Sequence, residues 1–228
     1  MNWQEFWNNR AKADDAWTQV GRIVKTPDKQ DEAMQKIAEH IAELLQLQKT
    51  DNVLDVCCGN GLVTSFVSGY CSSVTGVDFS EELITQAKNN FPNLYFYNAD
   101  VLNQQQLQNG AQQYDAIYLY FSFQYLESFD KGLQAIANLL AMLKPGGKLL
   151  IGDVPDRARF FVYYHSSSRL WQLFKQFLLN RNDMGKFWSE EEMLLICQKL
   201  NVRGSYLKQP HHLPHAHYRF DFVIENCL

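Results

Sequence analysis

Between residues 52 and 153, short apolar runs alternate with helical segments, and this alternation is the strongest constraint on the fold. Five runs rich in β-branched or aromatic residues begin near residues 52, 73, 94, 114 and 148. Helical patterns lie between them at 62–69, 80–90 and 129–143, and the proline and glycines of 144–147 are expected to end the last helix. Strands that alternate with helices form right-handed βαβ units, so the sequence predicts a doubly wound, mostly parallel α/β sheet.

Further elements are predicted on both sides of this core. Residues 31–47 place apolar side chains on one helical face, and residues 3–17 have the pattern of a weaker helix. Residues 202–209 and 217–225 alternate in hydrophobicity and are joined by a loop with two prolines, which predicts an antiparallel hairpin. We therefore expect an N-terminal helical cap over 1–48 and a main domain over 49–228.

Residues 156–188 interrupt the alternation with nine aromatic residues on mostly helical patterning. Ser189 and Glu192 then have the spacing of a capping box, which predicts a helix that extends to about Leu200. We interpret 156–188 as a helical insert after the fifth strand that acts as a lid or as the wall of an acceptor pocket. The alternative is that its rings form the core of an extra helical layer.

The composition excludes several classes of protein. The 228 residues include 21 Lys and Arg against 25 Asp and Glu, a formal net charge of −4, which disfavours a nucleic-acid or membrane-surface partner. No apolar run approaches the roughly 18–20 residues of a transmembrane helix, and the N-terminus lacks a signal-peptide pattern. The five cysteines are odd in number and contain no CxxC, so a cytoplasmic location is expected.

The sequence VLDVCCGNG, at residues 53–61, leads from a strand through a glycine turn into a helix. Glycines at 59 and 61 let a ligand approach the backbone, and the following helix offers free N–H groups. Asp78 and Asp100 end the next two strands, where carboxylates suit a ribose diol and an exocyclic amine. Each feature alone is also typical of a turn or a helix cap, but together at three strand ends they predict a nucleoside with an unphosphorylated ribose.

In their order along the chain, these motifs resemble those of class I S-adenosylmethionine-dependent methyltransferases. The resemblance covers residues 50–153 closely, through VLDVCCGNG, GVDFS, NAD, YDAIYLYFSFQYL and LKPGGKLLI, and the C-terminal tail loosely. It implies a Rossmann-like, seven-stranded sheet in the order 3-2-1-4-5-7-6 with the seventh strand antiparallel. It also implies S-adenosyl-L-methionine as the methyl donor and S-adenosyl-L-homocysteine as the product.

The resemblance also assigns cofactor-binding roles to the strand ends. Asp78 would hold the ribose, Phe79 would lie near the adenine, and Phe121 would lie near the sulfonium. The turn would pass beneath the methionine part of the cofactor. The complete predicted set is Asp55, Cys57, Gly59, Asn60, Gly61, Asp78, Phe79, Asp100, Val101 and Phe121. Cys57 departs from the family pattern, in which glycine is common at this position.

A histidine is the residue type expected for a proton acceptor at neutral pH. We select His165, in the aromatic segment, and His211 and His212, in the C-terminal loop that also contains His215 and His217. Each histidine alone is also typical of an exposed loop. The prolines of the loop and the absence of a nearby acid disfavour metal binding, so no metal is predicted.

The predicted reaction is methyl transfer to oxygen or nitrogen of a small organic acceptor. The absence of (Asn/Asp)-Pro-Pro-(Tyr/Phe) after the fourth strand disfavours an adenine or amide nitrogen as acceptor. Arg10 or Arg22 would meet the cofactor carboxylate unless both are surface charges. The alternatives are a nucleic-acid or protein methyltransferase, a non-catalytic S-adenosylmethionine-binding partner protein, and an NAD(P)-dependent oxidoreductase. The oxidoreductase is disfavoured because Thr64 replaces the third glycine of G-x-G-x-x-G.

Overall fold

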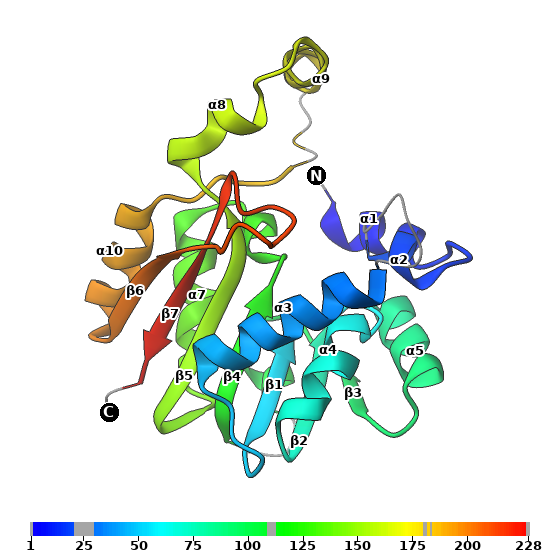
Figure 1. Ribbon diagram of the computed structural model, residues 1–228, viewed down its shortest axis with the longest axis vertical. Coiled ribbons are helices and arrows are strands. Elements are labelled where there is room, and N and C mark those ends of the chain that lie inside the picture. Colours follow the sequence, from blue (N-terminus) through cyan, green and yellow to red (C-terminus); the bar gives the residue numbers. More distant parts are fainter. Residues whose placement is uncertain (1, 21–29, 109–112, 180–181, 183, 227–228) are drawn as a thin grey trace.

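The computed structural model describes residues 2–20, 30–108, 113–179, 182 and 184–226. Its centre is a seven-stranded sheet in the order β3-β2-β1-β4-β5-β7-β6 (Figure 1), which confirms the predicted order. The strands are β1 (Asn52–Val56), β2 (Ser73–Asp78), β3 (Tyr95–Asn98), β4 (Tyr114–Tyr120), β5 (Leu143–Pro155), β6 (Arg203–Lys208) and β7 (Arg219–Glu225). The first five strands are parallel to one another, whereas β7 is antiparallel to both β5 and β6. The predicted hairpin accounts for the pairing of β6 with β7, and the resemblance implied the antiparallel seventh strand.

Helices cover both faces of this sheet (Figure 1). The α-helices are α1 (Trp3–Arg10), α2 (Ala16–Gln19), α3 (Gln30–Leu45), α4 (Leu62–Val67), α5 (Glu81–Asn90), α6 (Gln104–Leu107), α7 (Phe129–Leu140), α8 (Phe160–Tyr163), α9 (Ser167–Leu178) and α10 (Glu190–Leu200). Short 3-10 helices are η2 (Ser68–Tyr70), η3 (Phe123–Tyr125) and η4 (Arg157–Arg159). None of the described helices combines the length and apolar character that a bilayer span requires.

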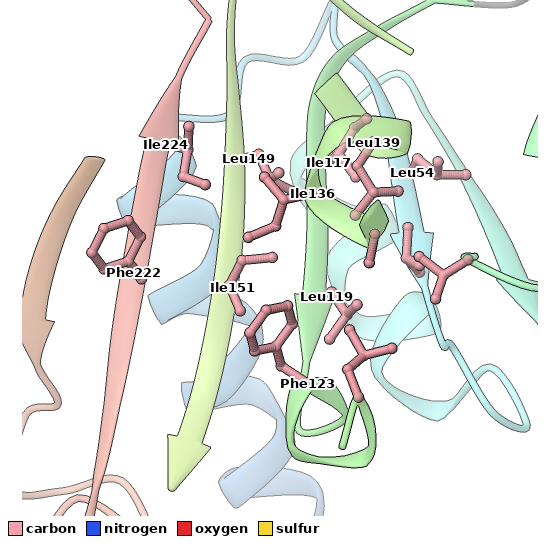
Figure 2. Packing of buried hydrophobic residues seen from close by; sticks show 14 of the residues in the cluster. Leu54, Ile117, Leu119, Phe123, Ile136, Leu139, Leu149, Ile151, Phe222 and Ile224 are labelled. Carbon is pink, nitrogen blue, oxygen red and sulfur yellow. The ribbon is translucent and has the colours of Figure 1, made fainter. Parts of the chain in front are cut away.

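Alternating side chains of the central strands form two hydrophobic layers. Leu54 and Leu149 point to the face covered by α7 and α10, and Figure 2 shows this layer between the strands and α7. Val53 and Leu150, their neighbours in sequence, pack on the opposite face against α3 and α4. Both layers are fully buried, so the carboxyl ends of the strands are held on a rigid base.

Two of the expected element boundaries are wrong. Residues 3–17 form two helices because Asp15 caps α2 through hydrogen bonds to the backbone N–H groups of Trp17 and Thr18. The helix expected over 129–143 ends at Leu140, and residues 144–147 belong to β5 instead of ending a helix. Gly147 is required there because a Cβ would lie 2.7 Å from the Asp115 carbonyl oxygen.

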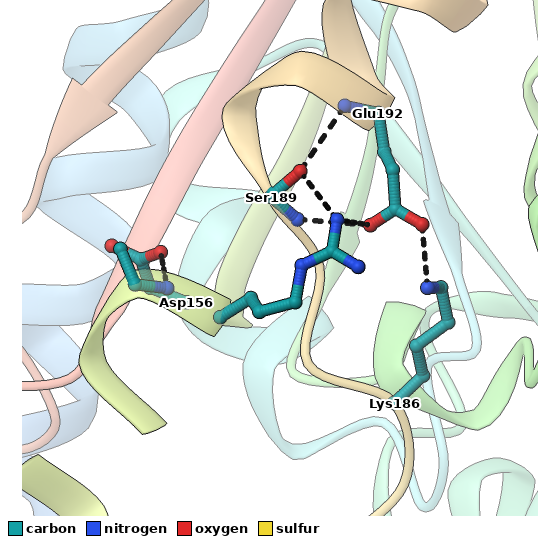
Figure 3. A network of polar contacts seen from close by, with 6 residues as sticks. Asp156, Lys186, Ser189 and Glu192 are labelled. Carbon is teal, nitrogen blue, oxygen red and sulfur yellow. Dashed lines mark hydrogen bonds and ion pairs between the residues drawn. The ribbon is translucent and has the colours of Figure 1, made fainter. Parts of the chain in front are cut away.

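The predicted N-terminal cap and aromatic insert differ in how they join the sheet. Helix α3 packs in the same hydrophobic layer as β1 and β5, and Trp17 of α2 packs against the edge of that layer. The insert is helical, as expected, and its two ends are held together (Figure 3): Arg157 donates to Ser189 Oγ at 2.8 Å, and Lys186 pairs with Glu192 at 2.7 Å. The predicted capping box of Ser189 and Glu192 is present.

Candidate functional site

A cavity of about 650 Å³ lies at the carboxyl ends of the parallel strands. Ligand pockets in proteins have volumes of roughly 300–1,000 Å³, so this cavity has the size of a small-molecule site. Its lining falls into two groups of residues. The β1–β3 half comprises Asp55, Cys57, Gly59, Asp78, Phe79, Asp100 and Val101, and the β4–β7 half comprises Tyr120, Phe121, Asp153, His215 and Arg219.

The glycine turn after β1 has a backbone conformation that favours glycine. Cys57, Gly59 and Gly61 all have positive φ angles, of 59°, 58° and 79°. Such angles cost a residue with a side chain roughly 1–2 kcal/mol, which explains why the resemblance leads one to expect glycine at position 57. Burial raises the pKa of the Cys57 and Cys58 thiols, chiefly because desolvation disfavours the charged thiolate. Neither thiol is therefore an activated nucleophile.

Asp78 links the tip of β2 to this turn. Its Oδ2 accepts a hydrogen bond from the Gly59 N–H at 2.9 Å, and its Oδ1 accepts one from the Ser80 N–H at 2.9 Å. Each carboxylate oxygen has two acceptor positions, so both oxygens retain capacity for the hydroxyls of a ribose. Desolvation raises the pKa of Asp78 to about 6, although its backbone hydrogen bonds act in the opposite direction.

Asp55 is the penultimate residue of β1. It is buried and accepts a hydrogen bond from the Thr64 hydroxyl at 2.6 Å, which fixes the carboxylate to α4. Desolvation raises its pKa to about 7, with the Thr64 hydrogen bond opposing the shift. The β1–β3 half therefore contains two buried carboxyls that a bound ligand with hydroxyl or ammonium donors would stabilise.

The tip of β3 supplies the outer wall of the same half. Asp100 is exposed, and its Oδ1 accepts from the Leu102 N–H at 2.9 Å, which forms a local turn of the kind that Asp favours. Phe79 and Val101 line the cavity beside it. Asp100 can form this turn and also bind a ligand in the cavity, because the turn uses Oδ1 and leaves Oδ2 as an acceptor.

Two predicted cofactor residues, Asn60 and Gly61, do not line the cavity. Asn60 Nδ2 donates to the Ala16 carbonyl at 2.7 Å and to Gln19 Oε1 at 2.9 Å, so it connects the turn to α2. A Cβ on Gly61 would lie 2.7 Å from the Phe96 ring. Both residues hold the turn in position, and the other eight predicted cofactor residues line the cavity.

The β4–β7 half begins where the two central strands end. Phe121 follows β4 with a φ of 71°, and Asp153, within β5, has a φ of 54°. Positive φ angles in residues with side chains cost energy and cluster at functional sites. Here they turn both side chains toward the cavity, next to the Tyr120 ring, whose centroid is 4.5 Å from that of Phe121.

A buried ion pair forms the polar part of this half. Arg219 Nη1 lies 2.9 Å from Asp153 Oδ2, and both side chains are more than nine-tenths buried. The Arg219 guanidinium also stacks on the Tyr218 ring, with a distance of 5.1 Å to its centroid. Among the described residues, Arg219 Nε has no hydrogen-bond acceptor. A buried donor without a partner costs about 1–3 kcal/mol, so a ligand oxygen there would relieve a real penalty.

A second layer of hydrogen bonds fixes this ion pair. Asp221 accepts from the Asp153 N–H at 2.8 Å and from Gln209 Nε2 at 3.0 Å. Its other oxygen lies 2.7 Å from His40 Nε2, on α3. The network connects three elements that are far apart in the sequence, and it sets the position of Asp153 at the cavity wall.

The helix α1 closes the cavity with aromatic side chains. Trp3, Phe6, Trp7 and Arg10 line it, and the Trp3 ring lies 4.4 Å from the Tyr125 ring. This is the position expected from the prediction that N-terminal helices cover one side of the site. Arg10 is on the cavity wall, and its Nε donates to the Thr18 carbonyl at 2.7 Å. Arg22 lies outside the described residues.

A family model described as "Methyltransferase domain" matches residues 29–204 of this chain. The match includes the β1–β3 half of the cavity and most of the sheet. The chain belongs to this family of methyltransferase domains.

Relatives of this methyltransferase domain resemble it over part of their length. The chain is 34% identical over 119 residues to a ubiquinone biosynthesis O-methyltransferase from Coxiella burnetii, with 50% of this chain and 48% of the relative covered. A sterol 4-C-methyltransferase from Caenorhabditis elegans is 27% identical over 129 residues, with 55% and 38% covered. The chain thus matches about half or less of the length of these curated relatives.

Solved structures show the same fold at low sequence identity. N-methyltransferase NodS from Bradyrhizobium japonicum, in complex with S-adenosyl-L-homocysteine, has a TM-score of 0.64 and 17% identity, with 99% of both chains covered. The amino pentose methyltransferase CalS10 from Micromonospora echinaspora, with bound S-adenosylmethionine, has a TM-score of 0.63 and 16% identity, with 86% of this chain and 90% of CalS10 covered.

In this methyltransferase domain, the three histidines selected as bases do not reach the cavity. His165 is exposed and its Nδ1 lies 2.8 Å from the Val162 carbonyl oxygen, and His211 and His212 are exposed in the C-terminal loop. His215 from the same loop lines the cavity. No described residue of 156–188 lines the cavity. Its aromatic rings come instead from α1, from Phe79 after β2, and from the end of β4 and the following η3. The sequence pattern that could have indicated Asp153 is its place at the end of the fifth strand run.

Proposed function

We propose that this methyltransferase domain moves a methyl group from S-adenosylmethionine to oxygen or nitrogen of a small organic acceptor. The observation that carries the proposal is the position of Asp78, whose carboxylate binds the glycine turn while Asp100 lines the same cavity. Carboxylates at two adjacent strand ends, beside a turn with an exposed backbone, match the hydroxyls and the amine of an adenosine.

Asp78 would hold the ribose, Asp100 and the Val101 backbone would bind the adenine, and Arg10 would pair with the carboxylate of the methionine part. S-adenosylmethionine supplies a methyl group on a sulfonium, which is transferred by an in-line displacement. The aromatic side chains of Trp7 and Phe121 give the adjoining space a dry wall with faces that attract a cation. Holding both reactants in this space contributes by alignment and by exclusion of water.

The β4–β7 half is assigned to the acceptor. Arg219 Nε would donate to an oxygen of the acceptor, and Asp153 would accept from its hydroxyl or amine. His215 is proposed as the proton acceptor in place of the three histidines outside the cavity. A site with paired donors and acceptors favours an acceptor with several polar groups and rejects a plain hydrocarbon.

The location and partners remain part of the proposal. The four described cysteines are free thiols, which supports a reducing cytoplasmic compartment. The net charge of −4 supports a small-molecule acceptor over a nucleic acid. A nucleic-acid or protein methyltransferase is therefore not favoured.

Isothermal titration calorimetry of the purified chain with S-adenosylhomocysteine tests cofactor binding. A turnover assay then measures formation of this product from S-adenosylmethionine with a panel of phenols, amino sugars and amines. Binding together with acceptor-dependent turnover is expected. Binding without turnover of any acceptor would favour a non-catalytic partner protein, and absence of binding would contradict the proposal.

The proton acceptor is tested with His215→Gln. We expect this substitution to lower kcat in single-turnover methylation at neutral pH while the Kd for S-adenosylhomocysteine is retained, because His215 lies in the acceptor half. The matched controls are His165→Ala and the pair His211→Ala and His212→Ala, which alter exposed histidines. If a control variant loses rate and His215→Gln does not, the proton acceptor is one of the three histidines that the sequence suggested.

A further inference from the structure

The helix α9 has an amphipathic pattern but exposes its apolar face. Leu170, Trp171, Phe174, Phe177 and Leu178 follow the spacing of one helical face, here called the apolar α9 face. Phe177 is 80% exposed, and Trp171 and Leu178 are each 65% exposed. The buried residue of this helix is a glutamine, Gln176. On the inner edge, Leu173 packs against the cluster of Tyr164, Phe187 and Tyr218. The larger apolar face of the helix is turned outward, the reverse of the orientation that hydrophobic burial favours.

Neighbouring side chains extend the exposed surface. Phe161 and Val162 of α8 are 77% and 45% exposed, and Leu179 follows α9 with more than half of its surface exposed. Isolated apolar residues on a surface are common, but several large ones on one helical face, as on α9, are typical of an interaction site. Figure 1 shows α8 and α9 at the top of the molecule, apart from the helices that cover the sheet.

The base of this segment is firmly attached to the main domain. Arg157 pairs with Glu192 at 3.1 Å, and the Arg157 N–H donates to the Trp188 carbonyl at 2.8 Å. Lys186 pairs with the other oxygen of Glu192 (Figure 3). These contacts attach both ends of the segment to the start of α10.

The charge of the segment identifies the kind of partner. Residues 157–179 contain Arg157, Arg159, Arg169 and Lys175 but none of the 25 Asp and Glu residues of the chain. Arg157 and Arg159 pair with Glu192 and Asp156 outside the segment, so the charge offered to a partner is that of α9. Helix α9 itself carries Arg169 and Lys175, and Arg169 stacks on the Tyr163 ring at 4.0 Å. A membrane partner is disfavoured by the net charge of the whole chain, which is −4. That total combines this basic segment with a remainder of the chain that is more acidic.

We propose that α8 and α9 dock on an anionic lipid surface, with the apolar α9 face inserted between the headgroups. Helices that lie in a membrane interface combine Trp, Phe and Leu on one face with Lys and Arg beside it, which is the arrangement found here. A two-fold dimer through the same face would bring two basic segments together, because such an interface is self-complementary. An anionic surface satisfies both the apolar face and the charge.

The test is co-sedimentation of the full chain with vesicles. Vesicles of phosphatidylcholine with phosphatidylglycerol are compared with vesicles of phosphatidylcholine alone. We expect roughly tenfold stronger binding to the anionic vesicles, a difference that high salt removes. The double variant W171Q/F177Q is expected to lose at least about tenfold in vesicle affinity, since it removes two inserted rings.

A matched control variant is available on α10. Leu194 and Leu195 are each 43% exposed but lie outside the segment, and L194Q/L195Q is expected to bind vesicles as the wild type does. Calorimetry with S-adenosylhomocysteine on all variants measures cofactor binding independently of vesicle binding. All variants are expected to keep the wild-type Kd, so a loss of vesicle binding alone concerns only the docking surface. Three results would overturn the proposal: no binding to either vesicle, equal binding by W171Q/F177Q, or sedimentation velocity showing a dimer that only W171Q/F177Q disrupts.

Discussion

The two halves of the cavity differ in how their residues are spaced along the chain. The β1–β3 half comes from three consecutive strand ends, between Asp55 and Val101, whereas the β4–β7 half joins residues from Tyr120 to Arg219. In the first half, each residue follows its own strand at a short, fixed spacing. In the second, an antiparallel strand and a C-terminal loop return to the parallel strands. Adjacent strand ends therefore form a motif that sequence reveals, and the returning elements form a site that only the fold reveals.

The halves also balance charge in different ways. Asp55 and Asp78 are buried without a basic partner in the described contacts, and desolvation raises the pKa of each. In the β4–β7 half, Asp153 is paired with Arg219, and its neighbour Asp221 is paired with His40. The first half is thus destabilised until a ligand binds, whereas the second is compensated within the protein.

Arg219→Met is expected to have the largest effect on stability. It leaves Asp153 buried without its cation, which costs about 3–5 kcal/mol. The measurement is urea unfolding, with the double variant Asp153→Asn and Arg219→Met as the matched control. The double variant should recover part of the loss because it removes the uncompensated charge. An equally unstable double variant would show that packing, not charge, is what Arg219 contributes.

The pH dependence of unfolding tests the uncompensated carboxyl Asp55. Because its pKa is raised to about 7 in the folded chain, the folded state binds more protons than the unfolded state between about pH 4 and 7. Stability of the ligand-free protein therefore decreases as pH rises through this window, by up to about 4 kcal/mol at 1.36 kcal/mol per pKa unit. Asp55→Asn should flatten this decline and be more stable than the wild type at pH 8.

The same unfolding series has a clear negative outcome. If urea midpoints of Asp55→Asn and the wild type change in parallel from pH 4 to 8, the burial of Asp55 carries no such penalty. Asp130→Asn, which changes an exposed carboxyl on α7, is the control for a general effect of charge.

Local signals predicted the parallel α/β sheet and the acids of the β1–β3 half, whereas the strand order came from the resemblance to class I methyltransferases. Strand and helix periods, the glycine turn and the acids at 78 and 100 lie within single βα units. The sequence did not predict that Asn60 would bind α2 instead of facing the cavity. It also could not select His215 from five histidines, since the choice depends on how the C-terminal loop returns to β4 and β5.

The aromatic segment shows a second limit of sequence reasoning. Its rings suggested a pocket wall because aromatic surfaces suit a sulfonium, but composition does not specify which side of a helix faces the protein. In α9 the apolar face is turned outward, while Trp3 and Phe6 of the much weaker helix pattern lie at the cavity. The lid role of 156–188 stays a prediction without a cavity contact among its described residues.

Asp78→Ala tests the half that the sequence identified. Under the proposed function it removes two charge-assisted hydrogen bonds to the ribose, each worth roughly 1.5–3 kcal/mol, so the Kd for S-adenosylhomocysteine should rise by about 100-fold or more. The measurement is calorimetry at pH 8, above the raised pKa of Asp78, where the carboxylate is ionised. Asp130→Asn is again the control. A rise in Kd of less than about threefold would show that Asp78 does not bind the cofactor.

Cys57→Gly is expected to have the smallest effect, and it separates backbone strain from side-chain function in the β1–β3 half. Glycine relieves the cost of a positive φ, roughly 1–2 kcal/mol, but loses more entropy on folding, about 0.5–1 kcal/mol. The net change in the free energy of unfolding should be a stabilisation of about 0–1.5 kcal/mol. Affinity for S-adenosylhomocysteine should be retained, because glycine adopts the same backbone conformation in the turn. A large loss of affinity would instead show that the Cys57 side chain contacts the cofactor directly, and the departure from glycine would then be functional.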